Sequence, residues 1–278
     1  MVSFSDIPDM TTVQFDHFAK LIHERAGIHL KEHKITLLSN RIRKRLHTLN
    51  MKDYDEYYQL LQNDRGNEMV HFLEVVTTNE SYFWRTTQNY DALKTHVLPE
   101  VLKQYRGQEL KLWSAGCSTG EEPYNLAIEL IESMRKLGFF NFRIVATDIS
   151  TRVVQFAREG RYTGRKIEKV PPEILNRYFK PLTDDPEVFE VRDDIKKKIE
   201  FRVENLFQST PSGMHVIFCR NVMIYFKREE QKVLVDRFHR ALLPGGYLFI
   251  GHAESLQMLN TDFRTISTPL GVLYRKER

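Results

Sequence analysis

The sequence predicts an α/β protein: a doubly wound parallel sheet, preceded by an all-helical segment and interrupted by a small β-rich insertion. Three observations support this fold class. Apolar residues recur at helical spacing from Thr12 to Leu61, and short β-prone runs alternate with helical ones after Gly107. The alternation of strands and helices breaks down between Gly160 and Lys198, where four prolines occur. With 278 residues, 41% of them hydrophobic, the chain is long enough for about two domains.

The first part of the chain is expected to be a helical domain over residues 1–76. Phe15, Phe18, Leu21 and Ile22 share the spacing of one helix face, and a further amphipathic segment runs from Glu68 to Val76. A linker and a first helix are then expected over residues 77–106.

The second part, residues 107–278, is expected to hold the parallel sheet, with the β insertion at about residues 175–202. The strands expected are Leu110–Ser114, Phe142–Thr147, Ile199–Val203, Met214–Cys219, Tyr247–Ile250 and Val272–Tyr274. The helices expected between them are Pro123–Lys136, Ser150–Glu159 and Arg228–Leu243.

The composition favours a soluble protein of a reducing, intracellular compartment. The formal net charge is +4 and the pI is near 8.9, which permits an acidic partner without demanding nucleic acid. Only two cysteines occur, Cys117 and Cys219, and both are expected to pack inside the sheet. No signal peptide and no apolar run of about 18 residues is found, so insertion into a membrane is not expected.

The segment from Trp113 to Pro123 joins a predicted strand to a predicted helix and is rich in small residues, including Gly116. Small residues let a backbone approach a ligand closely. Glu121 and Glu122 would repel a pyrophosphate at this helix entrance but attract a sulfonium and an amino acid head group. Alternatively, the two acids only favour the helix N-terminus.

Asp148 follows the second predicted strand, at the edge of the sheet where open α/β folds bind ligands. A carboxylate there can accept both hydroxyls of a ribose. Its alternative role is the N-cap of the next helix. Together with the acidic loop, Asp148 favours a positively charged adenosyl ligand.

Four motifs in this sequence resemble those of a known protein family, and the resemblance covers nearly the whole chain. They are Thr77–Arg85, Ala115–Tyr124, Ala146–Ser150 and Phe218–Phe226. The chain resembles the CheR family of chemotaxis receptor glutamate methyltransferases. The resemblance implies a Rossmann-like S-adenosylmethionine methyltransferase sheet with a small antiparallel β subdomain, preceded by an all-α N-terminal domain. It also implies methyl esterification of glutamate side chains on chemoreceptors, with S-adenosylhomocysteine as the second product.

The resemblance also implies the roles of individual residues. A cofactor site is expected from Asn79, Ser81, Arg85, Gly116, Glu121, Glu122, Asp148, Asn205, Leu206, Arg220 and Asn221. Of the two glutamates, Glu122 is favoured. Arg85 and Tyr225 are expected to act in catalysis. Without the family, Arg85 could be a surface residue of a helix and Tyr225 an aromatic side chain of the core.

The reaction needs no general base, because a glutamate with an ordinary pKa of about 4.3 is already a carboxylate near neutral pH. Attack of an anion on a sulfonium methyl removes charge, so a dry pocket should accelerate it. What remains is alignment, for which an arginine that steers one carboxylate oxygen and a tyrosine that restricts the approach are suited.

A basic run between Lys31 and His47 is the expected contact for the acidic methylation region of a receptor. Its charge comes from Lys31, Lys34, Arg41, Arg43, Lys44 and Arg45, against the single acid Glu32. Arg41, Arg43, Lys44 and Arg45 are the residues expected to bind the substrate. The ordinary alternative is a solvated helix face.

Other functions are less favoured by the sequence. His29 and His33 lack further ligands, so no metal site is expected. The turn in Lys180–Glu187 has no glycine, so weak or absent binding to a receptor's C-terminal peptide is expected. A nucleic acid methyltransferase would suit a basic helical domain, but the modest net charge counts against it. A third possibility is an adaptor that binds the cofactor without transferring its methyl group.

Overall fold

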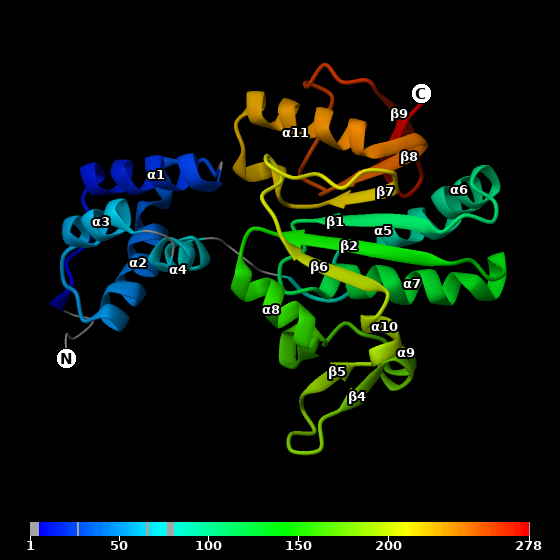
Figure 1. Cartoon of the computed structure of the whole chain (residues 1–278), viewed down its shortest axis with the longest axis horizontal. Helices are drawn as coiled ribbons and strands as arrows, with labels where there is room; N and C mark the ends of the chain where they lie inside the picture. The colour runs from blue at the N-terminus through cyan, green and yellow to red at the C-terminus, as the bar shows by residue number, and fades with distance from the viewer. Residues whose placement is uncertain (1–5, 27, 65–66, 77–80, 278) are drawn as a thin grey trace. The chain divides into compact units, whose positions relative to one another are not determined.

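The computed structural model describes residues 6–26, 28–64, 67–76 and 81–277 (Figure 1). The chain divides into two compact units. The first, the helical unit, comprises Met1–Thr78 and Tyr225–Lys227, and the second, the sheet unit, comprises Asn79–Ile224 and Arg228–Arg278.

The helical unit is built around one apolar core. Its helices are α1 (Thr12–Ala26), η2 (Glu32–Lys34), α2 (Ile35–Leu49), α3 (Tyr54–Asn63) and α4 (Asn67–Val76). Phe18, Ile42 and Phe72 are fully buried and come from three of these helices, because each helix carries apolar residues on one face. Asp53 caps α3 by accepting the backbone N–H groups of Asp55 and Glu56.

The sheet unit contains a seven-stranded sheet in the order β6-β2-β1-β7-β8-β10-β9. Its strands are β1 (Leu110–Ala115), β2 (Phe142–Asp148), β6 (Ile199–Val203), β7 (Met214–Cys219), β8 (Leu242–Ile250), β9 (Phe263–Thr268) and β10 (Gly271–Lys276). The pairings from β6 to β8 are parallel, and β10 runs antiparallel to both of its neighbours.

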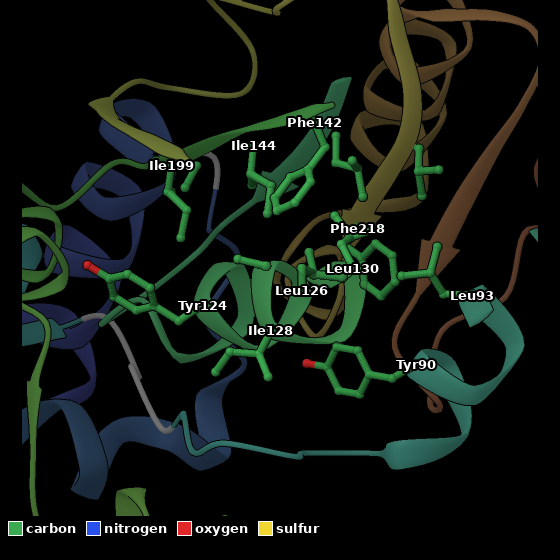
Figure 2. Packing of buried hydrophobic residues seen from close by; sticks show 14 of the residues in the cluster. Tyr90, Leu93, Tyr124, Leu126, Ile128, Leu130, Phe142, Ile144, Ile199 and Phe218 are labelled. Carbon is green, nitrogen blue, oxygen red and sulfur yellow. The ribbon is translucent and has the colours of Figure 1, made fainter. Parts of the chain in front are cut away.

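The helices of the sheet unit are α5 (Thr87–Ala92), η3 (Leu93–Val97), α6 (Leu98–Gln104), α7 (Glu121–Leu137), α8 (Thr151–Glu159) and α11 (Arg228–Ala241). Figure 1 shows α7 and α8 along one side of the sheet and α11 along the other. Every residue of β7 is buried, because strands covered by helices on both faces need apolar side chains on both. Figure 2 shows Leu126 and Leu130 of α7 in the same cluster as Ile144 and Phe218 of the strands.

A second, small sheet has the order β3-β5-β4 and is antiparallel. It is formed by β3 (Arg161–Tyr162), β4 (Phe179–Pro181) and β5 (Phe189–Val191), with η4 (Gly164–Lys166), α9 (Pro172–Tyr178) and α10 (Asp193–Lys196) between and after the strands. The small sheet thus begins at Arg161, before the limit near residue 175 expected from the sequence. It ends before β6, which belongs to the large sheet.

The remaining differences from the sequence prediction are local. Helix α7 begins at Glu121, two residues before the expected start, and β8 begins at Leu242 rather than Tyr247. Strand β9 was not predicted; it lies at the edge of the sheet, and Phe263 is its only buried residue. The short helix η5 (Met223–Tyr225) precedes α11. Among the described residues, no helix has the length and apolar character that crossing a bilayer requires.

The parallel strands bring four chain segments to one edge of the sheet. Ala115 pairs with Thr147, and Asp148 pairs with Val203, so β1, β2 and β6 end side by side. Strand β7 pairs with β1 on the other side and ends at Cys219. The segments that follow these four strands form the candidate site.

Candidate functional site

The loop after β1 has a backbone that turns sharply twice. Gly116 has φ +81° and Ser118 has φ +49°. A Cβ at Gly116 would lie 2.5 Å from Cγ2 of Val222, so a side chain here would force apart the segments after β1 and β7. The small residues therefore allow two strand-end segments to pack closely.

Asp148 joins this loop to the end of β2. Its Oδ2 accepts the N–H of Ser118 at 2.8 Å, and its Oδ1 accepts the N–H of Ser150 at 3.1 Å. The N-cap of α8 is Ser150, not Asp148, because the Ser150 hydroxyl accepts the N–H of Val153. Burial raises the pKa of Asp148, against the opposing effect of the backbone N–H groups.

Glu122 lies in the first turn of α7 and faces the ends of β1 and β7. Its Oε1 accepts the hydroxyl of Ser114 at 2.7 Å, and its Oε2 accepts Nη1 of Arg220 at 3.2 Å. The side chain keeps 14% exposure. Burial raises its pKa, and the positive charges of Arg220 and Arg85 act in the opposite direction.

Glu121 points elsewhere. Its side chain has no exposed surface, pairs with the ammonium of Lys166 and accepts the hydroxyl of Thr119 at 2.8 Å. Adjacent residues of a helix are about 100° apart, so the two glutamates cannot face the same space. The structure thus separates two acids that the sequence analysis grouped together.

Arg220 is almost completely buried, with 3% side-chain exposure. Besides Glu122 it reaches the hydroxyl of Tyr90 at 3.3 Å and the carbonyl of Arg85 at 2.5 Å. Its guanidinium also lies over the Tyr90 ring, 5.5 Å from the centroid. Arg220 is therefore held by three groups of the sheet unit.

Asn221 follows Arg220 in the left-handed region, with φ +59°. Its backbone N–H is accepted by Oε2 of Glu254 at 3.0 Å, and the same oxygen accepts the N–H of Gly251 at 2.5 Å. The other carboxylate oxygen accepts the N–H of Ile224 at 3.2 Å. One carboxylate thus fastens the segment after β7 to the end of β8.

The segment Ser81–Arg85 runs past the same region and is fixed by hydrogen bonds of its backbone and by the fully buried ring of Phe83. The N–H of Trp84 is accepted by Oδ1 of the buried Asn125 at 2.7 Å. The Arg85 guanidinium lies 5.9 Å from the centroid of the Tyr82 ring. Asn79, also expected at the cofactor, lies outside the described residues.

Asn205 and Leu206 follow β6, next to the end of β2. The N–H of Glu204 is accepted by the carbonyl of Asp148 at 2.9 Å, which joins the two segments. Asn205 accepts the N–H of Phe207 at 2.9 Å through Oδ1, and Leu206 is buried. The structure therefore brings Asp148, Asn205 and Leu206 to adjacent strand ends.

Tyr225 belongs to the helical unit. Its carbonyl accepts the N–H of His29 at 2.7 Å. Arg41, in α2, donates to the carbonyl of Val76 at 2.5 Å, and burial lowers its pKa, against an opposing effect of Tyr225.

The basic run on α2 carries less free charge than the sequence suggests. Arg43 donates to Asp9, and Arg45 donates twice to Glu68, which also accepts the hydroxyl of Tyr57. Arg45 and Glu68 keep only 17% and 12% side-chain exposure. The basic run therefore carries less unpaired positive charge than its composition suggests, because Arg43 and Arg45 pair with acids of the same unit.

Three residues of the site were missed by the sequence analysis. The Ser118 hydroxyl oxygen is buried and has no hydrogen-bond partner among the described residues. Lys166 and Glu254 make the contacts given above from distant parts of the chain. Only the position of Ser118 within the small-residue loop offered a signal in the sequence.

The described residues offer this site neither a cluster of metal ligands nor an exposed thiol. No group of three or more His, Cys, Asp and Glu side chains could hold a metal there. Cys117 and Cys219 are free and buried, and burial raises the pKa of both thiols, which disfavours the thiolate needed for nucleophilic attack.

The chemistry of the site suits a cationic ligand that carries hydroxyl groups. Two partly exposed carboxylates with raised pKa, Asp148 and Glu122, would gain from a nearby positive charge. The unpartnered Ser118 hydroxyl can hydrogen-bond a polar ligand group. These groups fit a nucleoside attached to a sulfonium and repel a pyrophosphate.

Comparisons with known proteins extend over both units. The all-alpha domain of the CheR methyltransferases matches residues 14–77, and their SAM binding domain matches residues 79–272. Chemotaxis protein methyltransferase 1 of Pseudomonas aeruginosa is 36% identical over 267 residues, 94% of this chain and 97% of that protein. The chemotaxis protein methyltransferase of Salmonella typhimurium is 34% identical over 259 residues, 91% of this chain and 88% of that protein. That of Borreliella burgdorferi is 34% identical over 257 residues, 90% of each chain.

Proposed function

Because the chain belongs to the CheR family of chemotaxis protein methyltransferases, we propose that the strand ends of the sheet unit form its S-adenosylmethionine site. The observation that carries this proposal is Asp148, a half-buried residue whose carboxylate joins the loop after β1 to the end of β2. In this arrangement it would accept the ribose hydroxyls, while Gly116 lets the segments after β1 and β7 pack closely beside it.

Several predictions from the sequence are confirmed at the level of the family: the methyltransferase fold, the S-adenosylmethionine cofactor and the methylation of chemoreceptor glutamates in adaptation. The protein is an enzyme of chemotaxis. The matches give no support to a nucleic acid methyltransferase or to a cofactor-sensing adaptor.

Glu122, rather than Glu121, is assigned to the charged part of the cofactor. It keeps some exposure and faces the strand ends, whereas Glu121 is fully buried against Lys166. Asn205 and Leu206 would border the adenine, since they follow β6 beside Asp148. Arg220 and Asn221 would act mainly by shaping this site, because Arg220 is committed to Glu122, Tyr90 and Arg85.

The catalytic roles follow from the charge of the acceptor. Bound S-adenosylmethionine supplies an electrophilic methyl group on a sulfonium. Arg85 would steer one oxygen of the acceptor carboxylate, because its positive charge already acts on Glu122 and so lies near the site. Tyr225 would restrict the approach of the acceptor, so that nucleophile, methyl carbon and sulfur lie in line. Neither residue has to remove a proton.

The receptor's methylation region is proposed to meet the exposed lysines of the helical unit in the cytoplasm. Lys31, Lys34 and Lys44 are exposed and have no ion-pair partner in the described part of the chain. Opposite charge mainly accelerates encounter and is screened by salt. Arg41, Arg43 and Arg45 are assigned a smaller share, since their guanidinium groups are engaged within the unit. Binding of a receptor's C-terminal peptide by the small sheet is expected to be weak or absent.

A combined binding and transfer experiment tests the proposal. The parent protein should bind S-adenosylhomocysteine in calorimetry and transfer a tritiated methyl group to receptor-rich membranes as a base-labile ester. Asp148→Asn should weaken binding about 10- to 100-fold, because hydrogen bonds from hydroxyls to a charged acceptor are worth about 1.5–3 kcal/mol. Exposed Asp184 offers a matched control, Asp184→Asn, which should bind as the parent does. Equal affinity in parent and Asp148→Asn would refute the assigned site.

A further inference from the structure

Lys166 joins three segments of the sheet unit that are far apart in sequence. It ends the short helix η4, directly after β3 of the small sheet. Its ammonium pairs with Glu121 in the first turn of α7 and donates to the Thr119 hydroxyl at 2.6 Å. It also reaches the carbonyl of Ser81 at 3.4 Å.

The three acceptors use the whole donor capacity of the side chain. A lysine ammonium has three N–H donors, and Glu121, Thr119 and Ser81 supply one acceptor each. No donor remains for a ligand. Lys166 therefore cannot be a cofactor ligand of the ordinary kind, and its effect must pass through the residues it holds.

Glu121 makes this contact obligatory. Its carboxylate has no exposed surface, whereas Lys166 keeps 29% side-chain exposure. An ionised carboxylate at such a position is costly without a paired cation. The buried Glu121 thus fixes the position of the Lys166 ammonium. The ammonium in turn fixes the Thr119 hydroxyl and the Ser81 carbonyl.

Lys166 holds the segment Ser81–Arg85 by two independent bonds. In addition to the side-chain contact with Ser81, its carbonyl accepts the N–H of Phe83 at 3.0 Å. The other end of the segment is held by Asn125 at Trp84 and by Arg220 at Arg85. The fully buried ring of Phe83, which contacts Tyr162 and Phe179, also holds this segment. Lys166 adds the polar contacts that fix the Ser81 end.

The loop after β1 is held by residues of the same part of the chain, β3 and η4. The hydroxyl of Tyr162, in β3, donates to the carbonyl of Thr119 at 2.7 Å. A Cβ at Gly120 would lie 2.9 Å from this hydroxyl oxygen, so the loop rests closely on β3. Lys166 adds the side-chain contact to Thr119 and so connects the loop to the Ser81 segment.

We propose that Lys166 is a positioning residue for the cofactor site, which sets the Ser81–Arg85 segment against the loop after β1 through its contacts with Glu121, Thr119 and Ser81. The inference rests on the proposed S-adenosylmethionine site, because Lys166 joins two segments of that site, Ser81–Arg85 and the loop after β1. It also gives Glu121 a structural role in place of the ligand role expected from the sequence.

The test compares four variants with the parent in S-adenosylhomocysteine calorimetry and in thermal unfolding. Lys166→Met leaves Glu121 unpaired and should lower Tm as well as affinity. The double variant Lys166→Met/Glu121→Gln removes both charges, so it should fold, yet still bind about tenfold or more weakly, because displaced positioning groups cost affinity. Lys166→Arg should restore Tm but not full affinity, since a planar fork cannot serve the three acceptors in the same way. Lys136→Met, an exposed lysine of the same helix as Glu121, should match the parent.

Steady-state kinetics add a readout that loss of stability alone would not change. In the double variant, KM for S-adenosylmethionine should rise about tenfold, with KM for receptor unchanged. A folded double variant with the parent's affinity and KM would overturn the role of Lys166. A parent protein that does not bind S-adenosylhomocysteine would instead refute the proposed site, so the two failures are distinguishable.

Discussion

Arg220 offers a prediction whose magnitude follows from its contacts. The change is Arg220→Met, which keeps much of the side-chain volume and removes the charge. The Arg220 side chain is 3% exposed, and its guanidinium donates to Glu122, the Tyr90 hydroxyl and the Arg85 carbonyl. The substitution leaves a carboxylate buried without its cation, and a hydroxyl and a carbonyl without their donor.

The expected loss of unfolding free energy is about 3–5 kcal/mol, the usual cost of removing one partner of a buried ion pair. Because Glu122 keeps 14% exposure and the Ser114 hydroxyl as a donor, the lower end, about 3 kcal/mol, is expected. With a urea dependence of about 2 kcal/mol per molar, the unfolding midpoint should fall by about 1.5 M.

Tryptophan fluorescence in urea measures this loss for the sheet unit alone. Both tryptophans of the chain, Trp84 and Trp113, belong to that unit. The control is Arg220→Met/Glu122→Leu, which replaces the pair by apolar side chains and should recover most of the stability. A midpoint for Arg220→Met within about 0.3 M of the parent, or a double variant no more stable than the single one, would refute the reasoning.

Three further outcomes are expected. Burial raises the pKa of Glu122 and Asp148, and the cationic cofactor favours the ionised form of both carboxyl groups. As the pH is lowered, the affinity for S-adenosylmethionine in calorimetry should therefore begin to fall at a higher pH than carboxyl groups of ordinary pKa would give. The affinity for S-adenosylhomocysteine, which lacks the sulfonium charge, should fall less. Gly116→Ala should lower the urea midpoint more than Gly107→Ala, because both have positive φ but only the first Cβ meets a neighbour; equal losses would contradict the packing argument. Arg45→Met should destabilise the helical unit by about 1.5–3 kcal/mol in calorimetric unfolding, since Glu68 loses its cation, and an unchanged Tm would count against that pairing.

The central sheet was predictable because its signal is local. Strands such as Met214–Cys219 are apolar on both faces and lie between helices with a clear apolar stripe. Strand β9 was missed because an edge strand with one solvated face alternates only weakly: of its six residues, only Phe263 is buried. Asp148 could be placed at the ligand-binding edge of the sheet because it lies between a predicted strand and a predicted helix.

The detailed roles of charged residues were not predictable, because they depend on distant partners. Glu121 and Glu122 are neighbours with the same chemistry, and only the packing of α7 decides which one faces Lys166. Arg43 and Arg45 count as positive charges in the sequence, yet their partners lie 34 and 23 residues away. A charge run therefore overstates the positive potential wherever the fold supplies acids from elsewhere.

The assignment of Tyr225–Lys227 to the helical unit has a practical consequence for dissecting the protein. A fragment starting at Asn79 would keep the tripeptide but lose His29, whose N–H binds the Tyr225 carbonyl. Expressed alone, such a fragment would contain the segments proposed to bind the cofactor, but the Tyr225 carbonyl would lack its hydrogen bond from His29. Under the role proposed for Tyr225, truncation would thus impair methyl transfer more than cofactor affinity, although the tyrosine itself remains in the polypeptide.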